Sequence, residues 1–116
     1  MILIIGGYAQ GKLEFARKTF GLTDDEIADG AICSAEEISD KRCVNNLHLY
    51  IKRGMAVDLN RPDGKIIISD EVGQGVVPVD QFERQWRENV GRTCCVLADA
   101  AGEVYRVYAG IGVRIK

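Results

Sequence analysis

The first twenty residues constrain the fold more than any other part of the chain. Residues 2–5 (ILII) form an uninterrupted apolar run, and residues 6–12 (GGYAQGK) follow it with three glycines and a lysine. A continuous apolar run is typical of a strand buried on both faces, as in a parallel sheet. Leu13, Ala16 and Phe20 then repeat at spacings of three and four, which is the helical period. The segment therefore predicts a buried strand, a tight glycine loop and a helix in direct succession.

The glycine loop has the GxxxxGK spacing of a phosphate-binding loop, in which backbone N–H groups and a helix N-terminus converge on the anion. Lys12 would reach the β- and γ-phosphates of a nucleotide. The complete motif continues with Ser or Thr, whose hydroxyl binds Mg²⁺, whereas this chain has Leu13. A glycine-rich turn with a surface lysine is the alternative interpretation. The candidate nucleotide-binding residues are Gly6, Gly7, Tyr8, Ala9, Gln10, Gly11, Lys12 and Leu13.

A second apolar run, residues 66–68, leads into two acidic residues, Asp70 and Glu71. Carboxylates at the C-terminal end of a parallel strand lie where α/β sheets bind ligands. We therefore predict Asp70 and Glu71 as candidate Mg²⁺ ligands, and Lys12 and Glu71 as candidate catalytic residues. A solvated acidic turn is the alternative.

The other segments alternate between strand and helix patterns. Thr23 and Glu26 have the spacing of a capping box, which predicts a single helical turn. Strands alternating with helices predict an α/β fold, here a P-loop NTPase-like, three-layer domain with a mostly parallel sheet and a C-terminal antiparallel hairpin strand. We expect a short strand at 31–33, a helix over 34–53, a turn at 61–64, a glycine loop at 72–78, a long helix from 80 to 101 with an apolar stripe that begins at Phe82, a strand at 104–108 and a last strand at 113–116.

Length and charge narrow the classes of function. A chain of 116 residues predicts one domain, residues 1–116. The net charge of −2 offers no basic excess for a nucleic-acid backbone, so we expect no nucleic-acid partner. No apolar stretch approaches the length of a membrane span, and the run at 2–5 is too short for a signal peptide, which predicts a cytoplasmic protein without a membrane partner. The four cysteines form no CxxC pair and are predicted to be buried, reduced thiols.

Residues 69–78 (SDEVGQGVVP) closely resemble the (S/T)(N/D)EVGxGxVP signature of adenosylcobinamide kinase / adenosylcobinamide-phosphate guanylyltransferases. The resemblance touches most of the chain and is strongest over residues 66–116. Further similar segments are the phosphate loop at 6–12, a helix with an Asn-Leu pair at 44–51, the long helix at 82–92 and the C-terminal strand pair at 98–116.

The resemblance implies a P-loop type α/β fold and assembly as an oligomer. It implies a kinase that uses a nucleoside triphosphate to phosphorylate the aminopropanol arm of cobinamide, then transfers GMP from GTP through a covalent histidine. The chain departs from this pattern at Leu13. It is also shorter than the members of the family, because a gap between the first helix and about Ala28 removes the segment with the guanylylated histidine. Ser34 stands where the family strand ends in Asp, if residues 31–34 match that strand. His48, the single histidine, is interpreted as a packing or surface residue.

These patterns predict a nucleotide-binding protein related to the cobinamide kinases of cobalamin biosynthesis, with GTP or ATP as cofactor. The case for Mg²⁺ is weakened by Leu13. If active, the chain is expected to be an NTP-dependent phosphotransferase acting on adenosylcobinamide, without guanylyl transfer. The alternatives are an inactive module that binds nucleotide or a corrinoid, and a structural homo-oligomer. Candidate residues for a subunit surface, or equally for ordinary core, are Val104, Tyr105, Val107 and Tyr108.

Overall fold

The computed structural model describes residues 1–58, 63–72 and 79–116. Within these residues six strands form one sheet in the order β2-β3-β4-β1-β5-β6. The elements in chain order are β1 (Ile2–Gly6), α1 (Lys12–Phe20), the 3₁₀ turn η1 (Asp24–Glu26), β2 (Ile27–Asp29), α2 (Ala35–Asp40), β3 (Cys43–Asn45), α3 (Leu47–Lys52), β4 (Ile66–Asp70), α4 (Gln81–Ala100), β5 (Glu103–Tyr108) and β6 (Ile111–Arg114).

The sheet is parallel except at one edge. Strand β1 lies between β4 and β5 and runs parallel to both, whereas β5 and β6 pair antiparallel. This confirms the mostly parallel sheet with a C-terminal antiparallel strand. Gly6, the last residue of β1, lies in register with Asp70 of β4 and with Val107 of β5. The loop that follows β1 therefore starts beside the acidic end of β4, at the carboxyl edge where α/β sheets bind ligands.

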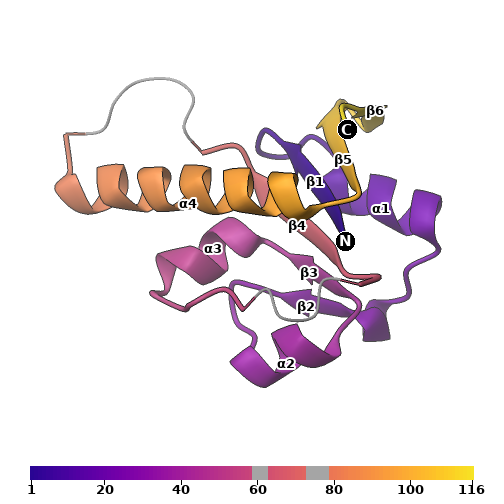
Figure 1. Cartoon of the computed structure of the whole chain (residues 1–116), viewed down its shortest axis with the longest axis horizontal. Coiled ribbons are helices and arrows are strands. Elements are labelled where there is room, and N and C mark those ends of the chain that lie inside the picture. The colour runs from indigo at the N-terminus through magenta and orange to yellow at the C-terminus, as the bar shows by residue number, and fades with distance from the viewer. Residues whose placement is uncertain (59–62, 73–78) are drawn as a thin grey trace.

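Helices cover both faces of the sheet, which confirms the three-layer architecture. Figure 1 shows α1 on one side of the strands and α2, α3 and α4 on the other. Ala16 of α1 packs with Ile4 and Ile68 in one core cluster. Leu97 of α4 packs with Leu3 in the other. Successive residues of β1 thus point to opposite faces, as the pleat of a strand requires.

The helix and turn signals at several element ends are confirmed. Gly21 ends α1 with φ 65°, a left-handed conformation that glycine adopts readily. Thr23 and Glu26 form the predicted capping box around η1. Asp80 accepts a hydrogen bond from the backbone N–H of Phe82, at 2.8 Å, and so caps α4.

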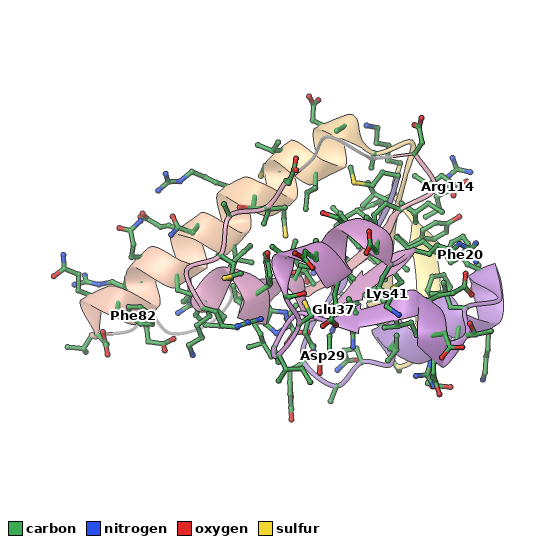
Figure 2. The ribbon with its side chains drawn as sticks, turned by 90° about the horizontal axis from the view of Figure 1, so that it is seen from below. Phe20, Asp29, Glu37, Lys41, Phe82 and Arg114 are labelled. Atoms are coloured by element: carbon green, nitrogen blue, oxygen red, sulfur yellow. The ribbon has the colours of Figure 1, made fainter. Side chains whose placement is uncertain are left out.

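The apolar stripe predicted along α4 does not reach the core at its first turn. Phe82 is 59% exposed, whereas Val90 and Leu97 are buried. Figure 2 shows Phe82 at the end of α4 farthest from Phe20 and Arg114. The first turn of α4 therefore extends beyond the part of the helix that packs on the sheet.

The predicted helix over 34–53 is wrong, because β3 interrupts it. The sequence forms α2, then Cys43–Asn45 as a strand between β2 and β4, then α3. Cys43 and Val44 are buried and pair on both sides. A strand buried between two neighbours gains more from pairing and packing than the helical spacing of these residues could provide, so tertiary context overrides the local pattern.

The strand predicted at 31–33 is also wrong, because a turn occupies these residues and the strand is β2, Ile27–Asp29. The Asp29 carboxylate accepts a hydrogen bond from the backbone N–H of Ala31, and its carbonyl accepts from Ile32 and Cys33. An Asp side chain that bonds the backbone two residues on favours a turn over a strand. Parts of the predicted turn at 61–64 and of the glycine loop at 72–78 lie outside the described residues.

The prediction of buried, reduced thiols holds for two of the four cysteines. All four are free, and Cys33 and Cys43 are buried. Burial raises the pKa of the Cys43 thiol to about 12, so it stays protonated at neutral pH. Cys94 is half-buried, and Cys95 is exposed on α4, where the prediction is wrong. Across the described residues, no helix is both long and apolar enough to cross a membrane.

Three of the four candidate surface residues of β5 belong to the core. Val104 and Val107 are buried, and Tyr105 packs against the rings of Phe15 and Phe20. Tyr108 is 51% exposed. Tyr108 therefore remains the member of this set available to a subunit surface, and oligomer formation stays a prediction.

Replacing Lys65 with methionine should lower the free energy of unfolding by about 2 kcal/mol, because an ammonium that donates to three backbone carbonyls, two of them in part-buried bonds, is lost. The Lys65 ammonium donates to the carbonyls of Ile38, Ser39 and Lys41 and so ties the end of α2 to the start of β4. Urea denaturation followed by circular dichroism measures the change. Lys18→Met, at an exposed position of α1, is the matched control. Equal stability of the two variants would contradict the prediction.

Candidate functional site

The loop between β1 and α1 has the conformation that its glycines were expected to permit. A Cβ at Gly6 would lie 2.6 Å from the carbonyl oxygen of Val107, closer than real side chains come to backbone. Gly11 has φ 84°, and Ala9 adopts φ 57°, also left-handed. The loop thus curls tightly against β5 and needs glycine at both of its ends.

The turn between β5 and β6 supports this loop from one side. The backbone N–H of Gly110 donates to the carbonyl of Gln10 at 2.7 Å. The backbone N–H of Ala109 donates to the Gln10 side-chain Oε1 at 2.8 Å. These two bonds link residues far apart in sequence and hold the middle of the loop in place.

The backbone amides of the loop point to no acceptor within the protein. Among the described residues, no hydrogen bond has the N–H of any residue from 8 to 13 as its donor. The first four N–H groups of a helix lack intrahelical partners, and successive free amides in a tight loop form a concave anion site. The loop therefore offers a run of donors to a ligand.

Lys12 lies at the centre of the site. Its ammonium is 2.6 Å from Asp70 Oδ1 and donates to the carbonyl of Gly7 at 2.7 Å. The side chains of Lys12 and Asp70 are 8% and 15% exposed, so the ion pair is largely withdrawn from water. The loop thus faces the acidic end of β4, as the sequence predicted.

His48 of α3 holds the other side of Asp70. Its Nδ1 accepts a hydrogen bond from the backbone N–H of Asp70 at 3.1 Å, and its Nε2 lies 3.3 Å from Asp70 Oδ2. Because Nδ1 accepts, the neutral ring carries its proton on Nε2, the nitrogen that lies near Asp70 Oδ2. Trp86 donates from Nε1 to the His48 carbonyl at 2.7 Å. Burial lowers the pKa of His48 below its usual value, and the nearby Asp70 carboxylate only partly opposes this, which favours the neutral ring.

Glu71 lies next to Asp70 but takes part in a different set of contacts. Its carboxylate pairs with the Arg106 guanidinium at 3.1 Å, and its backbone N–H donates to the carbonyl of Gly6 at 2.9 Å. The Arg106 guanidinium also lies over the ring of Tyr108. Successive side chains along an extended chain point to opposite faces, which separates the two acids that the sequence places together.

A cavity of about 630 Å³ opens beside the loop. Most of the predicted site residues line it, but Gly6, Gly7 and Glu71 do not. The family resemblance aligned Ser34 with an Asp at the end of a strand. In the structure Ser34 is the N-cap of α2, and its side chain accepts a hydrogen bond from the Glu37 N–H. The lining residues are Tyr8, Ala9, Gln10, Gly11, Lys12, Leu13, Glu14, Asn45, Asn46, His48, Leu49, Asp70, Val72 and Trp86.

The sequence analysis did not identify Asn45, Asn46 and His48 as cavity residues. Asn46 has φ 59° and bonds the Asp29 carboxylate through its side-chain amide at 3.0 Å. Asn45 ends β3, and His48 lies in the first turn of the helix that follows. A strand recognised at Cys43–Asn45 would have placed all three at the carboxyl edge of the sheet, because parallel strands end together.

The residues beside the loop do not fit the Mg²⁺ ion that the family resemblance implies. Leu13 has no oxygen and packs its side chain against a core cluster. Asp70 is paired with Lys12, and Glu71 is paired with Arg106. In the described ranges, no three His, Cys, Asp or Glu side chains are grouped as metal ligands. These contacts argue against the metal-ligand roles predicted for Asp70 and Glu71, which stay predictions.

Comparison of the sequence with known proteins shows which family the chain belongs to. The sequence profile of cobinamide kinase / cobinamide phosphate guanyltransferase matches residues 32–115, a range that begins after the β1–α1 loop. The bifunctional adenosylcobalamin biosynthesis proteins CobU of Escherichia coli (strain K12) and Salmonella typhimurium (strain LT2) are each 44% identical to the chain over 55 residues. That stretch covers 47% of this chain and 30% of each relative. Since the profile spans well over half of the sequence, the chain belongs to the cobinamide kinase / cobinamide phosphate guanyltransferase family.

Proposed function

We propose that this chain binds a nucleoside triphosphate, GTP or ATP, in the cavity beside the β1–α1 loop. One observation supports the proposal above all: Lys12 and the other residues of the loop from 8 to 13, whose backbone amides have no acceptor among the described residues, line the same 630 Å³ cavity. Amides at a helix N-terminus and a nearby lysine are the groups that bind phosphate in such loops. The names of the two relatives, which are adenosylcobalamin biosynthesis proteins, suggest that the nucleotide serves this pathway.

Phosphoryl transfer to cobinamide is the reaction that the family name suggests for this site. In that reaction Lys12 would stabilise negative charge on the transferred phosphate. Asp70 is better placed than Glu71 to face an acceptor hydroxyl, because Asp70 lines the cavity. Glu71 would first have to leave Arg106 before it could act as the predicted catalytic residue or metal ligand.

Guanylyl transfer is not part of the proposal. The family resemblance implies that GMP is transferred through a covalent histidine intermediate. That reaction needs an imidazole nitrogen that is free to attack phosphorus. His48 is the single histidine of the chain, and its two ring nitrogens both contact Asp70. A ring held in this way presents no lone pair to the cavity.

Calorimetric titration with GTP and with ATP tests the proposed function. We expect saturable binding of one nucleotide per chain with a Kd of about 10 μM, a common strength for nucleotide sites, or about −7 kcal/mol. Incubation with adenosylcobinamide and the bound nucleotide, followed by chromatography of the corrinoid, then tests phosphoryl transfer. Binding without a phosphorylated product would identify a nucleotide-binding module without kinase activity. The absence of heat with both nucleotides would remove the proposal.

A further inference from the structure

The carboxylate of Asp70 has both of its oxygens engaged by side chains of this protein. Lys12 Nζ lies 2.6 Å from Oδ1, and His48 Nε2 lies 3.3 Å from Oδ2. These partners approach from α1 and α3, on opposite faces of the sheet. A divalent cation bound to Asp70 would have to displace the lysine ammonium from a largely buried ion pair.

The other positions that could supply metal ligands are occupied or lack oxygen. Leu13 stands where a phosphate loop provides a hydroxyl, and its side chain packs against the core. Glu71 is held by Arg106 and does not line the cavity. Mg²⁺ requires oxygen ligands in near-ideal octahedral geometry. The hydrocarbon side chain of Leu13 cannot supply one, so this position contributes no ligand.

The Lys12 ammonium and the backbone amides of the loop are groups that can bind an anion without a metal ion. The Lys12 ammonium forms an ion pair with Asp70 and donates to the carbonyl of Gly7. Residues 8–13, whose backbone amides have no acceptor among the described residues, line the same cavity as this ammonium's side chain. Since Asp70 is already neutralised by Lys12, a phosphate entering the loop meets no unpaired carboxylate from that residue.

We infer that the cavity binds the phosphate chain of its ligand without a divalent cation held by the protein. This inference rests on the proposed nucleotide binding and adds to it that the bound form is the metal-free anion. The inference is supported by the contacts of Leu13 with the core, of Asp70 with Lys12 and of Glu71 with Arg106. A polyphosphate free of Mg²⁺ bears more negative charge than its Mg²⁺ complex, so Mg²⁺ in solution competes with the protein for the ligand.

The test is a calorimetric titration of the wild-type chain with GTP and with inorganic triphosphate, in EDTA and in Mg²⁺. We expect affinity in EDTA to equal or exceed the affinity in Mg²⁺. Tightening by Mg²⁺ of more than about threefold would overturn the inference while leaving nucleotide binding intact. No heat under either condition would instead reject the proposed function, and this inference with it.

Two variants at position 13 separate a missing oxygen from lost side-chain bulk. Leu13→Ser restores a hydroxyl where the phosphate loop places one, so Mg²⁺ should tighten GTP binding by about tenfold in this variant. Leu13→Ala removes similar bulk without adding oxygen, so its affinity should remain insensitive to Mg²⁺. The same Mg²⁺ dependence in both variants would overturn the explanation by ligand chemistry. The wild-type comparison stands even if either variant fails to fold.

Discussion

Lys12→Met should weaken GTP binding at least about 100-fold, a loss of about 2.7 kcal/mol. Lys12 is the only lysine or arginine among the described residues that line the cavity. Methionine keeps most of the aliphatic stem and removes the charge, so loop packing is preserved while the cationic contact disappears. The lost ammonium also leaves Asp70 as an unneutralised carboxylate facing the phosphate. Calorimetric titration of wild type and variant with GTP under identical salt measures the difference.

Two further variants separate the charge of Lys12 from its structural role. Lys18→Met, on an exposed position of the same helix, should bind GTP like the wild type. Asp70→Asn in the Lys12→Met background removes the unpaired carboxylate and should restore part of the stability lost in the single variant, because unpaired buried charges are strongly destabilising. Wild-type affinity in Lys12→Met would show that this loop does not bind the nucleotide.

The segments that could be predicted from sequence are those specified by neighbouring residues. The run at 2–5 is apolar on both faces, so a buried strand is its favourable conformation. The GxxxxGK spacing places Lys12 at the first turn of α1, and the parallel register of Gly6 with Asp70 brings the two charges together. The position of Asp70 beside the phosphate loop thus followed from two local patterns and one general property of parallel sheets, whereas its ion pair with Lys12 was not predicted.

The segments that could not be predicted depend on contacts between distant residues. Cys43 and Val44 fit a helical pattern, and only their pairing with β2 and β4 makes the strand favourable. Local sequence carries no signal of which strands will flank a three-residue segment. Missing this strand also concealed Asn45 and His48, because their position follows from where β3 ends.

The separation of Asp70 and Glu71 is a second feature that the local sequence could not predict. Their adjacency in sequence favoured a shared metal site, but the alternation of side chains directs Asp70 to Lys12 and Glu71 to Arg106. Arg106 comes from β5, which lies next to β1. The partner of Glu71 could be identified only once the strand order was known, because no local spacing connects residues 71 and 106.

Gly30→Ala should lower the free energy of unfolding by about 3 kcal/mol, since an added methyl group would collide with backbone that cannot move aside alone. A Cβ at Gly30 would lie 2.3 Å from the carbonyl oxygen of Asn46, and the Gly30 N–H donates to the Asn45 carbonyl at 2.7 Å. Relief of the collision requires the turn after β2 to separate from the end of β3. That movement shifts Asn45 and Asn46, which form one wall of the cavity.

Gly91→Ala provides a matched control with an effect of opposite sign. Gly91 lies within α4, and a Cβ there would meet no atom within 4 Å. Alanine should raise the free energy of unfolding by about 0.5–1 kcal/mol, because it loses less backbone entropy than glycine when a helix forms. Urea denaturation measures both variants. Wild-type stability in Gly30→Ala would mean that the turn after β2 can move away from Asn46 without loss, and the wall formed by Asn45 and Asn46 would then not depend on this close approach.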